Sequence, residues 1–265
     1  MNRRASHLLS AALALSLCHP CSAAAPLPIG DPALRDSRAS TAEPNISGVW
    51  QVRGAGLRIA PMEGGDPPWK PWAEKVFRDR AADEKRGVTQ WDPTGACYGS
   101  GTPRILTVGY MTEIIQTADV IVWTFESQHV YRVIQMNRKM PANPGHSIRG
   151  YSVGHWEGDT LVVETRNMTA TNAITPYPRS AEARVIERWQ RRNDPQYGDS
   201  LHVDVTVIDP QVFAEPGRGE GLLKRAPKGV HVGGYNCSEQ LWDNYVAARE
   251  KGLAQSGPAN VTAPK

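Results

Sequence analysis

The sequence is poor in cysteine, in phenylalanine and in unbalanced charge. Its 265 residues hold 4 cysteines and 3 phenylalanines, and its formal net charge at pH 7 is +3. Such a small charge, with no basic stripe interleaved with aromatic residues, argues against nucleic acid as a partner. After residue 24, no apolar run approaches the roughly 20 residues that a membrane-spanning helix needs. No membrane span is therefore expected.

Familiar catalytic fingerprints are also missing from the sequence. It contains no nucleophile elbow, no zinc-binding His-Glu-x-x-His, no phosphate-binding loop and no dinucleotide-binding glycine pattern. Beyond residue 24 only two cysteines remain, which is too few for a typical cysteine zinc site. These absences predict that the protein works without a cofactor and without a metal ion.

The first 24 residues have the pattern of a secretory signal peptide. Arg3 and Arg4 precede an apolar run from Leu8 to Cys18, and small residues follow up to Ala24. Cleavage is expected near Ala24, with lipidation at Cys18 as an alternative, and the mature protein is expected in the periplasm or outside the cell. Without this segment 28 basic residues face 27 acidic ones, so the mature chain is nearly neutral.

The remaining chain is expected to form one domain. Residues 25–43, rich in proline, alanine and serine, read as a disordered lead-in to a single domain over residues 44–252, and residues 253–265 as a flexible tail. Cys97 and Cys237 are the two cysteines of the mature chain. In an oxidising compartment two cysteines most simply form one disulfide.

The middle of the sequence alternates apolar and polar residues with the period of β-strands. The expected elements are a helix over residues 71–85, strands near 45–52, 112–117, 120–126 and 129–135, hairpins over 148–165 and 182–209, a loose glycine-rich segment after Pro210, and a helix from Ser238 to before Gly252. At least eight strands in a meander with a helix near each end predict a mainly β protein, an antiparallel β-barrel of lipocalin type. A β-sandwich is the alternative fold. The side chains expected to be buried in the barrel are Leu161, Val163, Leu201, Val203 and Val205.

The hairpin over residues 151–164 carries ionisable side chains on one face. With Glu157-Gly158 as a two-residue turn, Tyr151 lies opposite Glu164, and His155 shares their face. In one interpretation this face meets solvent while the apolar face forms the core. In the other, Tyr151 and Glu164 point inward and present a phenol and a carboxylate for proton transfer. The alternation alone leaves both interpretations open.

The preceding hairpin repeats this theme. A tight turn after Glu126 pairs it with His129 and sets Trp123 opposite Arg132. The functional interpretation is a carboxylate that holds a histidine, with Arg132 as an anion clamp. The alternative is a salt bridge and a cation–π contact at the sheet surface.

The segment GYSVGHWEGDTLVVET, residues 150–165, resembles the signature GHSVGRWEGDTLVV of a large group of secreted, mostly uncharacterised bacterial proteins. Further matching segments are GTPR (101–104), YRVI (131–134), VIERW (185–189), VTVIDP (205–210) and YNCSEQ (235–240). In that signature the residue at Tyr151 is typically histidine and the one at Glu164 is often aspartate, which favours the inward interpretation. In addition, GVW at residues 48–50 resembles the Gly-x-Trp start of lipocalin-type barrels.

These features lead to three competing functions. The first is a cofactor-independent acid–base enzyme, a lyase or an isomerase, that acts on a small hydrophobic or aromatic molecule in the barrel cavity. Its catalytic residues would be Tyr151, Glu164, His129 and His155, and its substrate-binding residues Arg132, Trp123 and Glu126. The second is a lipocalin-like protein that binds a hydrophobic ligand without turnover, and the third is a structural envelope protein with a filled barrel.

Overall fold

The computed structural model describes residues 43–53, 66–88, 92, 94–95, 97–174 and 177–250. The predicted signal peptide with its cleavage point and Cys18, the predicted lead-in up to residue 42 and the predicted tail lie outside the described residues. All described residues belong to one compact unit, Ala33–Lys265.

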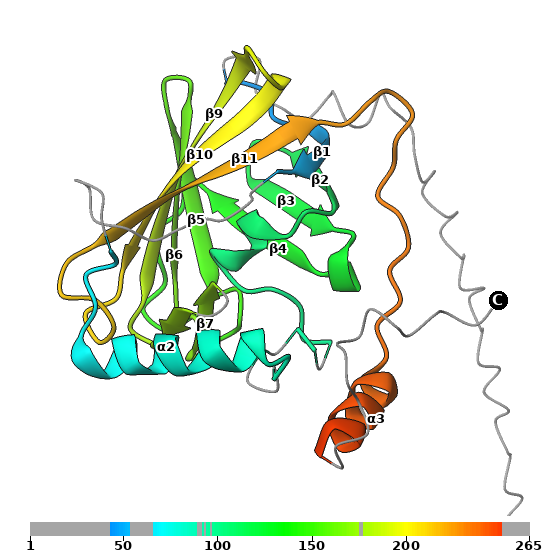
Figure 1. Cartoon of the computed structure of the whole chain (residues 1–265). Helices are drawn as coiled ribbons and strands as arrows, with labels where there is room; N and C mark the ends of the chain where they lie inside the picture. The colour runs from blue at the N-terminus through cyan, green and yellow to red at the C-terminus, as the bar shows by residue number, and fades with distance from the viewer. Residues whose placement is uncertain are drawn as a thin grey trace, which may run out of the picture. The chain divides into compact units, whose positions relative to one another are not determined.

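The described chain is mainly β (Figure 1). Its strands are β1 (Gly48–Val52), β2 (Met111–Gln116), β3 (Val120–Phe125), β4 (Tyr131–Met136), β5 (Tyr151–Glu157), β6 (Thr160–Arg166), β7 (Thr171–Ile174), β8 (Tyr177–Arg179), β9 (Arg184–Asp194), β10 (Gly198–Ile208) and β11 (Gly217–Arg225). Its helices are α2 (Pro71–Lys85) and α3 (Glu239–Glu250), with the short 3-10 turns η1 (Arg104–Thr107) and η2 (Ser127–His129).

Nine of the described strands close into a barrel, in the order β1-β11-β10-β9-β6-β5-β4-β3-β2, while β7 and β8 form a separate two-stranded sheet. The predicted β-barrel is confirmed. One pair departs from the antiparallel meander, because β4 and β5 run parallel. Residues 137–150 connect these two strands, and a connection of this length can return the chain to the end where β4 begins.

Strand β11 forms where the sequence predicted a loose segment. It closes the barrel between β10 and β1, with Leu201 facing Leu223 on one side and Trp50 facing Arg225 on the other. The glycines of β11 conceal its strand pattern in the sequence. A Cβ atom at Gly221 would lie 3.4 Å from the side chain of Leu106, which is an ordinary contact distance, so packing does not require a glycine at this position.

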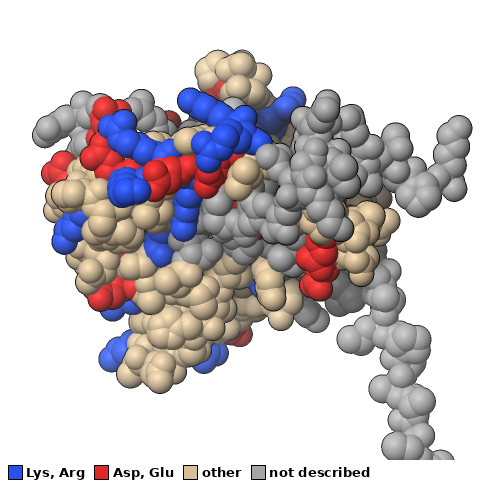
Figure 2. All heavy atoms as spheres, turned by 60° about the horizontal axis from the view of Figure 1, so that its bottom comes forward, with Lys and Arg blue, Asp and Glu red and all other residues tan. Residues whose placement is uncertain are grey.

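Helix α2 has the predicted bounds and lies at one end of the barrel (Figure 1). Pro71 suits its first turn, where the missing N–H has no helical acceptor to lose. Ala73 is fully buried, and the N–H of Lys70 donates to the carbonyl of Val212 at 2.9 Å, which ties the helix start to the chain after β10. Figure 2 shows this face of the molecule, on which acidic and basic side chains lie next to each other.

The barrel interior holds the hydrophobic core. The five side chains predicted to be buried, Leu161, Val163, Leu201, Val203 and Val205, are each at most 1% exposed, as the alternation of β6 and β10 requires. Among the largest fully buried side chains are the indoles of Trp50, Trp123 and Trp189. At the predicted start of α3, the Ser238 hydroxyl caps the helix by accepting the N–H of Leu241 at 3.3 Å.

Candidate functional site

The predicted catalytic pair on β5 and β6 is not formed. The turn lies at Gly158-Asp159 and not at Glu157-Gly158, so Tyr151 faces Arg166 and Glu164 faces Val153. Gly158 has a φ of 62°, and a two-residue turn with glycine at its first central position takes this conformation readily. The predicted register is therefore wrong by two residues.

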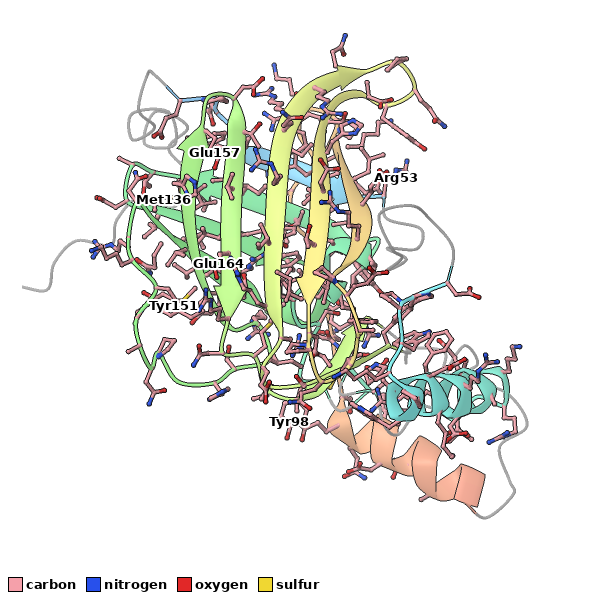
Figure 3. All side chains as sticks on the ribbon, turned by 90° about the vertical axis from the view of Figure 1, so that its left-hand side faces the viewer. Arg53, Tyr98, Met136, Tyr151, Glu157 and Glu164 are labelled. Atoms are coloured by element: carbon pink, nitrogen blue, oxygen red, sulfur yellow. A yellow bond between two sulfur atoms is a disulfide. The ribbon has the colours of Figure 1, made fainter. Side chains whose placement is uncertain are left out.

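Both side chains also lie on the outer face of the barrel, together with His155. The inward positions of β5 and β6 are occupied by Ser152, Gly154, Trp156, Leu161, Val163 and Thr165. Figure 3 views this hairpin from outside and has Tyr151 and Glu164 along it. The predicted inward orientation of Tyr151, Glu164 and His155 is wrong, because a shift of two residues preserves the face and this face is the outer one.

The outer face is a ladder of exposed ion pairs. Glu164 accepts a hydrogen bond from Arg166 at 2.5 Å, and Arg184 lies 2.6 Å from the same oxygen. Glu157 binds Arg188 at 2.9 Å and His155 at 3.1 Å. The hydrogen bond from Arg188, followed by that from His155, holds the pKa of Glu157 below its ordinary value. Exposed pairs of this kind contribute little to stability, because water and salt screen them.

In the preceding hairpin the predicted pairing of Trp123 with Arg132 is confirmed. The predicted carboxylate–histidine pair is not formed; the backbone N–H of His129 donates to the backbone carbonyl of Glu126 at 3.3 Å, but the two side chains have other partners. The Glu126 carboxylate instead accepts the N–H of Met111 at 3.2 Å, and His129 Nε2 accepts the N–H of Tyr235 at 2.9 Å. Each side chain therefore accepts a hydrogen bond from the backbone of another segment, at Met111 and at Tyr235.

Arg132 is buried inside the barrel, where it forms a closed polar network. Its guanidinium donates to both carboxylate oxygens of Glu187, at 3.0 and 2.6 Å, to Thr165 Oγ1 at 2.7 Å and to Ser152 Oγ at 3.1 Å. The Arg132 and Glu187 side chains are 2% and 0% exposed. Because the carboxylate neutralises this guanidinium within the core, Arg132 is not positioned as the predicted anion clamp.

The sequence interpretation did not single out Glu187. Its signal is the alternation of Val185, Glu187 and Trp189 along β9, all of which are buried. A charged residue in register with buried apolar ones on a strand requires a buried partner of opposite charge. The sequence does not reveal that this partner lies 55 positions earlier.

Aromatic rings and aliphatic side chains fill the rest of the barrel interior. Trp123 lies 4.3 Å from Phe125 and 4.9 Å from Trp189, measured between ring centroids. The gaps between these side chains leave no room for a water molecule, as at the place lined by Ile46, Ile114, Ile121, Trp123, Ile134, Leu161 and Trp189. The barrel therefore holds no ready-made ligand cavity at this place.

A larger cavity lies beside α2. It measures about 250 Å³ and is lined by Asp66, Pro67, Trp69, Glu74, Phe77, Arg78 and Tyr177. Local packing explains its position: the segment before α2 pairs with the chain after β10 through the bridge between Trp69 and Phe213. The sequence places Phe77 within the helix predicted over residues 71–85, but it contains no signal for a cavity.

Three of the residues that line this cavity are aromatic, and their rings pack against one another. The centroids of Trp69 and Phe77 lie 5.0 Å apart, those of Trp69 and Tyr177 5.3 Å, and those of Phe77 and Tyr177 5.0 Å. The ring of Phe213, which is not part of the lining, packs against Trp69 with a centroid distance of 5.1 Å. Aromatic pairs at these distances stabilise packing beyond the area that they bury.

The rim of the cavity carries charge. Glu74 accepts two hydrogen bonds from Arg78, at 3.1 and 2.5 Å, one helical turn along α2. This hydrogen bond, with the charges of Glu74 and Asp66, raises the pKa of Arg78 above its ordinary value. The Arg78 and Glu74 side chains are 74% and 40% exposed. Two carboxylates and one guanidinium thus belong to the lining of the cavity.

The predicted disulfide between Cys97 and Cys237 is present, with Cα atoms 5.8 Å apart. It joins the loop before η1 to the segment after β11, beside the contact between the rings of Tyr110 and Tyr235 at 5.5 Å. Such a bond is consistent with an extracellular protein. No helix within the described ranges is long and apolar enough to cross a membrane.

Arg179 is a buried cation that the sequence interpretation also missed. It donates to the backbone carbonyls of Thr102, of Ile148 at 3.1 Å and of Thr169 at 2.8 Å. Burial lowers its pKa to about 10, against the opposing charge of Asp209. Arg179 therefore joins three chain segments at one point and has a structural role.

No group of three or more His, Cys, Asp or Glu side chains in the described part of the chain could hold a metal ion. No protein-family model matches the chain, and no curated protein matches it either. The similarity of residues 150–165 to a signature of secreted bacterial proteins therefore stays a prediction.

Proposed function

We propose that the protein binds a small molecule without converting it, and that the binding site is the aromatic cavity beside α2. The observation that carries this proposal is a cavity of about 250 Å³ whose lining includes three aromatic rings and three charged side chains. Pockets for small molecules typically combine an apolar or aromatic wall with a few polar groups that orient the ligand.

Binding without turnover is favoured because the predicted proton-transfer groups are not assembled. Tyr151, Glu164 and His155 lie on the outer face of the barrel, and His129 accepts a backbone N–H. A general acid or base must reach its substrate within hydrogen-bond distance. A lyase or isomerase reaction that relies on these four residues thus has no common place for a substrate.

The proposed site of action is the periplasm or the exterior of the cell, after removal of the first 24 residues. The disulfide between Cys97 and Cys237 supports this placement, because such bonds form and persist in oxidising compartments. The basic and apolar pattern of residues 1–24 supports it independently.

The indole N–H signals of the ¹⁵N-labelled protein test the position of the site. A panel of small aromatic and apolar molecules should shift the signal of Trp69, assigned through a Trp69→Phe variant. Signals of Trp123 and Trp189 should stay in place, because these rings lie in the packed barrel interior. If ligands shift the interior signals and leave Trp69 unchanged, the proposed site is wrong, and if nothing in the panel shifts any signal, the proposed function fails.

A further inference from the structure

We propose that the guanidinium of Arg149, beside the exposed residue Tyr131, binds the carboxylate group of a ligand. Arg149 lies in the connection between β4 and β5, and it is not among the residues that line the cavity beside α2. The carboxylate site is therefore separate from the site of the proposed function and does not depend on it.

Arg149 carries a charge that the described part of the protein does not neutralise. Its Nη1 atom is buried without a hydrogen-bond partner, and no described carboxylate forms an ion pair with this side chain. Arg132, by contrast, is paired with Glu187. Buried polar groups nearly always have partners, and a partly desolvated charge without one costs free energy. Because Arg149 is only half-buried, an anion can reach the rest of its guanidinium and supply the missing charge.

Hydrogen bonds to the backbone hold Arg149 in place. Thr102 Oγ1 donates to the carbonyl of Arg149 at 3.0 Å, and Arg179 donates to the carbonyl of Ile148 at 3.1 Å. The position of Arg149 therefore does not require a partner for its own side chain. A binding residue whose backbone is fixed by neighbouring hydrogen bonds is preorganised for its ligand.

The chain closes tightly around Arg149 Nη1. A Cβ atom on Gly99 would lie 3.6 Å from this nitrogen and 2.5 Å from Val130 Cγ1, so only glycine fits there. Gln128, which also borders Gly99, has a φ of 56°, and its side-chain amide donates to the carbonyl of Thr94 at 2.8 Å. Non-glycine residues in this left-handed conformation are strained, and such strain is frequent at ligand sites.

The sheet register brings Tyr131 to the same place. Strands β4 and β5 pair in parallel with Ile134 opposite Ser152, and the same register, continued back along both chains, sets Tyr131 opposite Arg149. Burial lowers the pKa of Arg149 below its ordinary value, and Tyr131 acts in the opposite direction through its charge, so the two side chains are within electrostatic reach. Tyr131 is 61% exposed, and a phenol can donate a hydrogen bond to an anion.

A single guanidinium favours a carboxylate over a phosphate group. Its planar N–H groups match the two oxygens of a carboxylate, and one positive charge balances one negative charge. Phosphate groups are typically recognised by clusters of arginines. Arg179, the other arginine on this segment, is already bound to the backbone carbonyls of Ile148 and Thr169.

Propionate and propionamide, which have nearly the same shape, separate charge from size. The backbone N–H signal of Gly99 in the ¹⁵N-labelled protein reports binding, with sodium chloride keeping the ionic strength equal. We expect propionate to bind at least about tenfold more tightly, because hydrogen bonds between charged groups are roughly twice as strong as neutral ones. Acetyl-glycyl-alanine with a free or an amidated C-terminus then distinguishes a peptide end from a small acid as the source of the carboxylate: tighter binding of the free peptide than of propionate indicates a peptide end.

Matched variants test the two residues. Arg149→Gln removes the charge and should weaken propionate binding at least about tenfold, and Tyr131→Phe removes only a hydroxyl and should weaken it about threefold. Arg138→Gln makes the same change of charge at an exposed position of the same connection and should have no effect. Tyr131→Phe keeps the test decisive if Arg149→Gln does not fold.

Stability without a ligand separates a binding residue from a structural one. Arg149→Met removes an uncompensated charge, so its urea midpoint should be equal to or above that of the unmodified protein. A lower midpoint would show that the guanidinium has a partner within the protein and would overturn the inference. It is also overturned if propionamide binds as well as propionate, if inorganic phosphate binds more tightly than propionate, or if Arg149→Gln retains full affinity. None of these results affects the proposed function, whose test is the Trp69 signal.

Discussion

The buried pair of Arg132 and Glu187 allows a sharp test of the difference between a structural cation and a ligand clamp. The two side chains are 2% and 0% exposed and share two hydrogen bonds, at 3.0 and 2.6 Å. Removing one partner leaves the other as an uncompensated buried charge, which typically costs about 3–5 kcal/mol. We therefore expect Arg132→Met and Glu187→Leu each to lower the free energy of unfolding by that amount.

The double variant should recover most of this loss. Replacing both members of a buried ion pair by apolar side chains of similar size is often neutral or stabilising. The hydroxyls of Ser152 and Thr165 lose their guanidinium donor, but they remain hydrogen-bonded to each other at 2.9 Å. We expect the double variant to lie within about 2 kcal/mol of the unmodified protein.

Urea unfolding at pH 7, with the disulfide intact, measures all four proteins of this cycle. The exposed pair of Arg184 and Glu164 supplies the control, because Arg184→Met should cost less than about 1 kcal/mol. If Arg132→Met costs as little as this control but abolishes ligand binding, Arg132 is a clamp and the structural interpretation is refuted. If the double variant loses as much as both single variants together, the two residues do not act as a pair.

Three further predictions concern other parts of the molecule. The disulfide closes a loop of 140 residues, and the loss of chain entropy in the unfolded state limits its contribution to about 5 kcal/mol. Replacing both Cys97 and Cys237 by serine should lower the free energy of unfolding in urea by about 2–4 kcal/mol. If it is not lowered, the segment after β11 is uncoupled from the barrel. Burial disfavours charged Asp92, but hydrogen bonds and charge from Arg104 outweigh it and hold its pKa below the ordinary value. The ion pair of Asp92 and Arg104 therefore stabilises the fold above about pH 4, and this stabilisation is lost as the pH falls through the lowered pKa of Asp92. Asp92→Asn should lower stability more at pH 7 than at pH 3. Urea unfolding midpoints at the two pH values would show the difference. Glu164→Gln should not change ligand affinity, measured by ligand titration, and should change the free energy of unfolding by less than about 1 kcal/mol. A tenfold loss of affinity would show that the hairpin of β5 and β6 belongs to the binding site.

The sequence predicted the local elements well because their signals are local. Helix α2 follows from Pro71 and the apolar spacing of the next turns, and the buried faces of β6 and β10 follow from alternation. The pairing of Cys97 with Cys237 needed only their number and an oxidising compartment. The barrel itself was predictable from many short strands joined by short turns.

The tertiary structure alone decided which face of β5 and β6 points inward. Alternation defines two faces but does not say which one the barrel encloses, and polar residues occupy both faces near Tyr151. Which face points inward depends on whether the inward side chains of all strands together fill the barrel interior without gaps or clashes. The same holds for the parallel contact of β4 with β5 and for the closing strand β11, whose glycines carry little strand signal.

The cavity beside α2 likewise exists only in three dimensions. Trp69, Phe77 and Tyr177 come from the segment before α2, from α2 itself and from β8, and their spacing along the chain contains no pattern of a site. From the sequence alone, these residues are aromatic, and Trp69 and Phe77 lie just before and within a predicted helix. Their meeting around a space that no side chain fills depends on how the helix packs on the barrel end, because packing between distant segments is set by the shapes of all surfaces in contact.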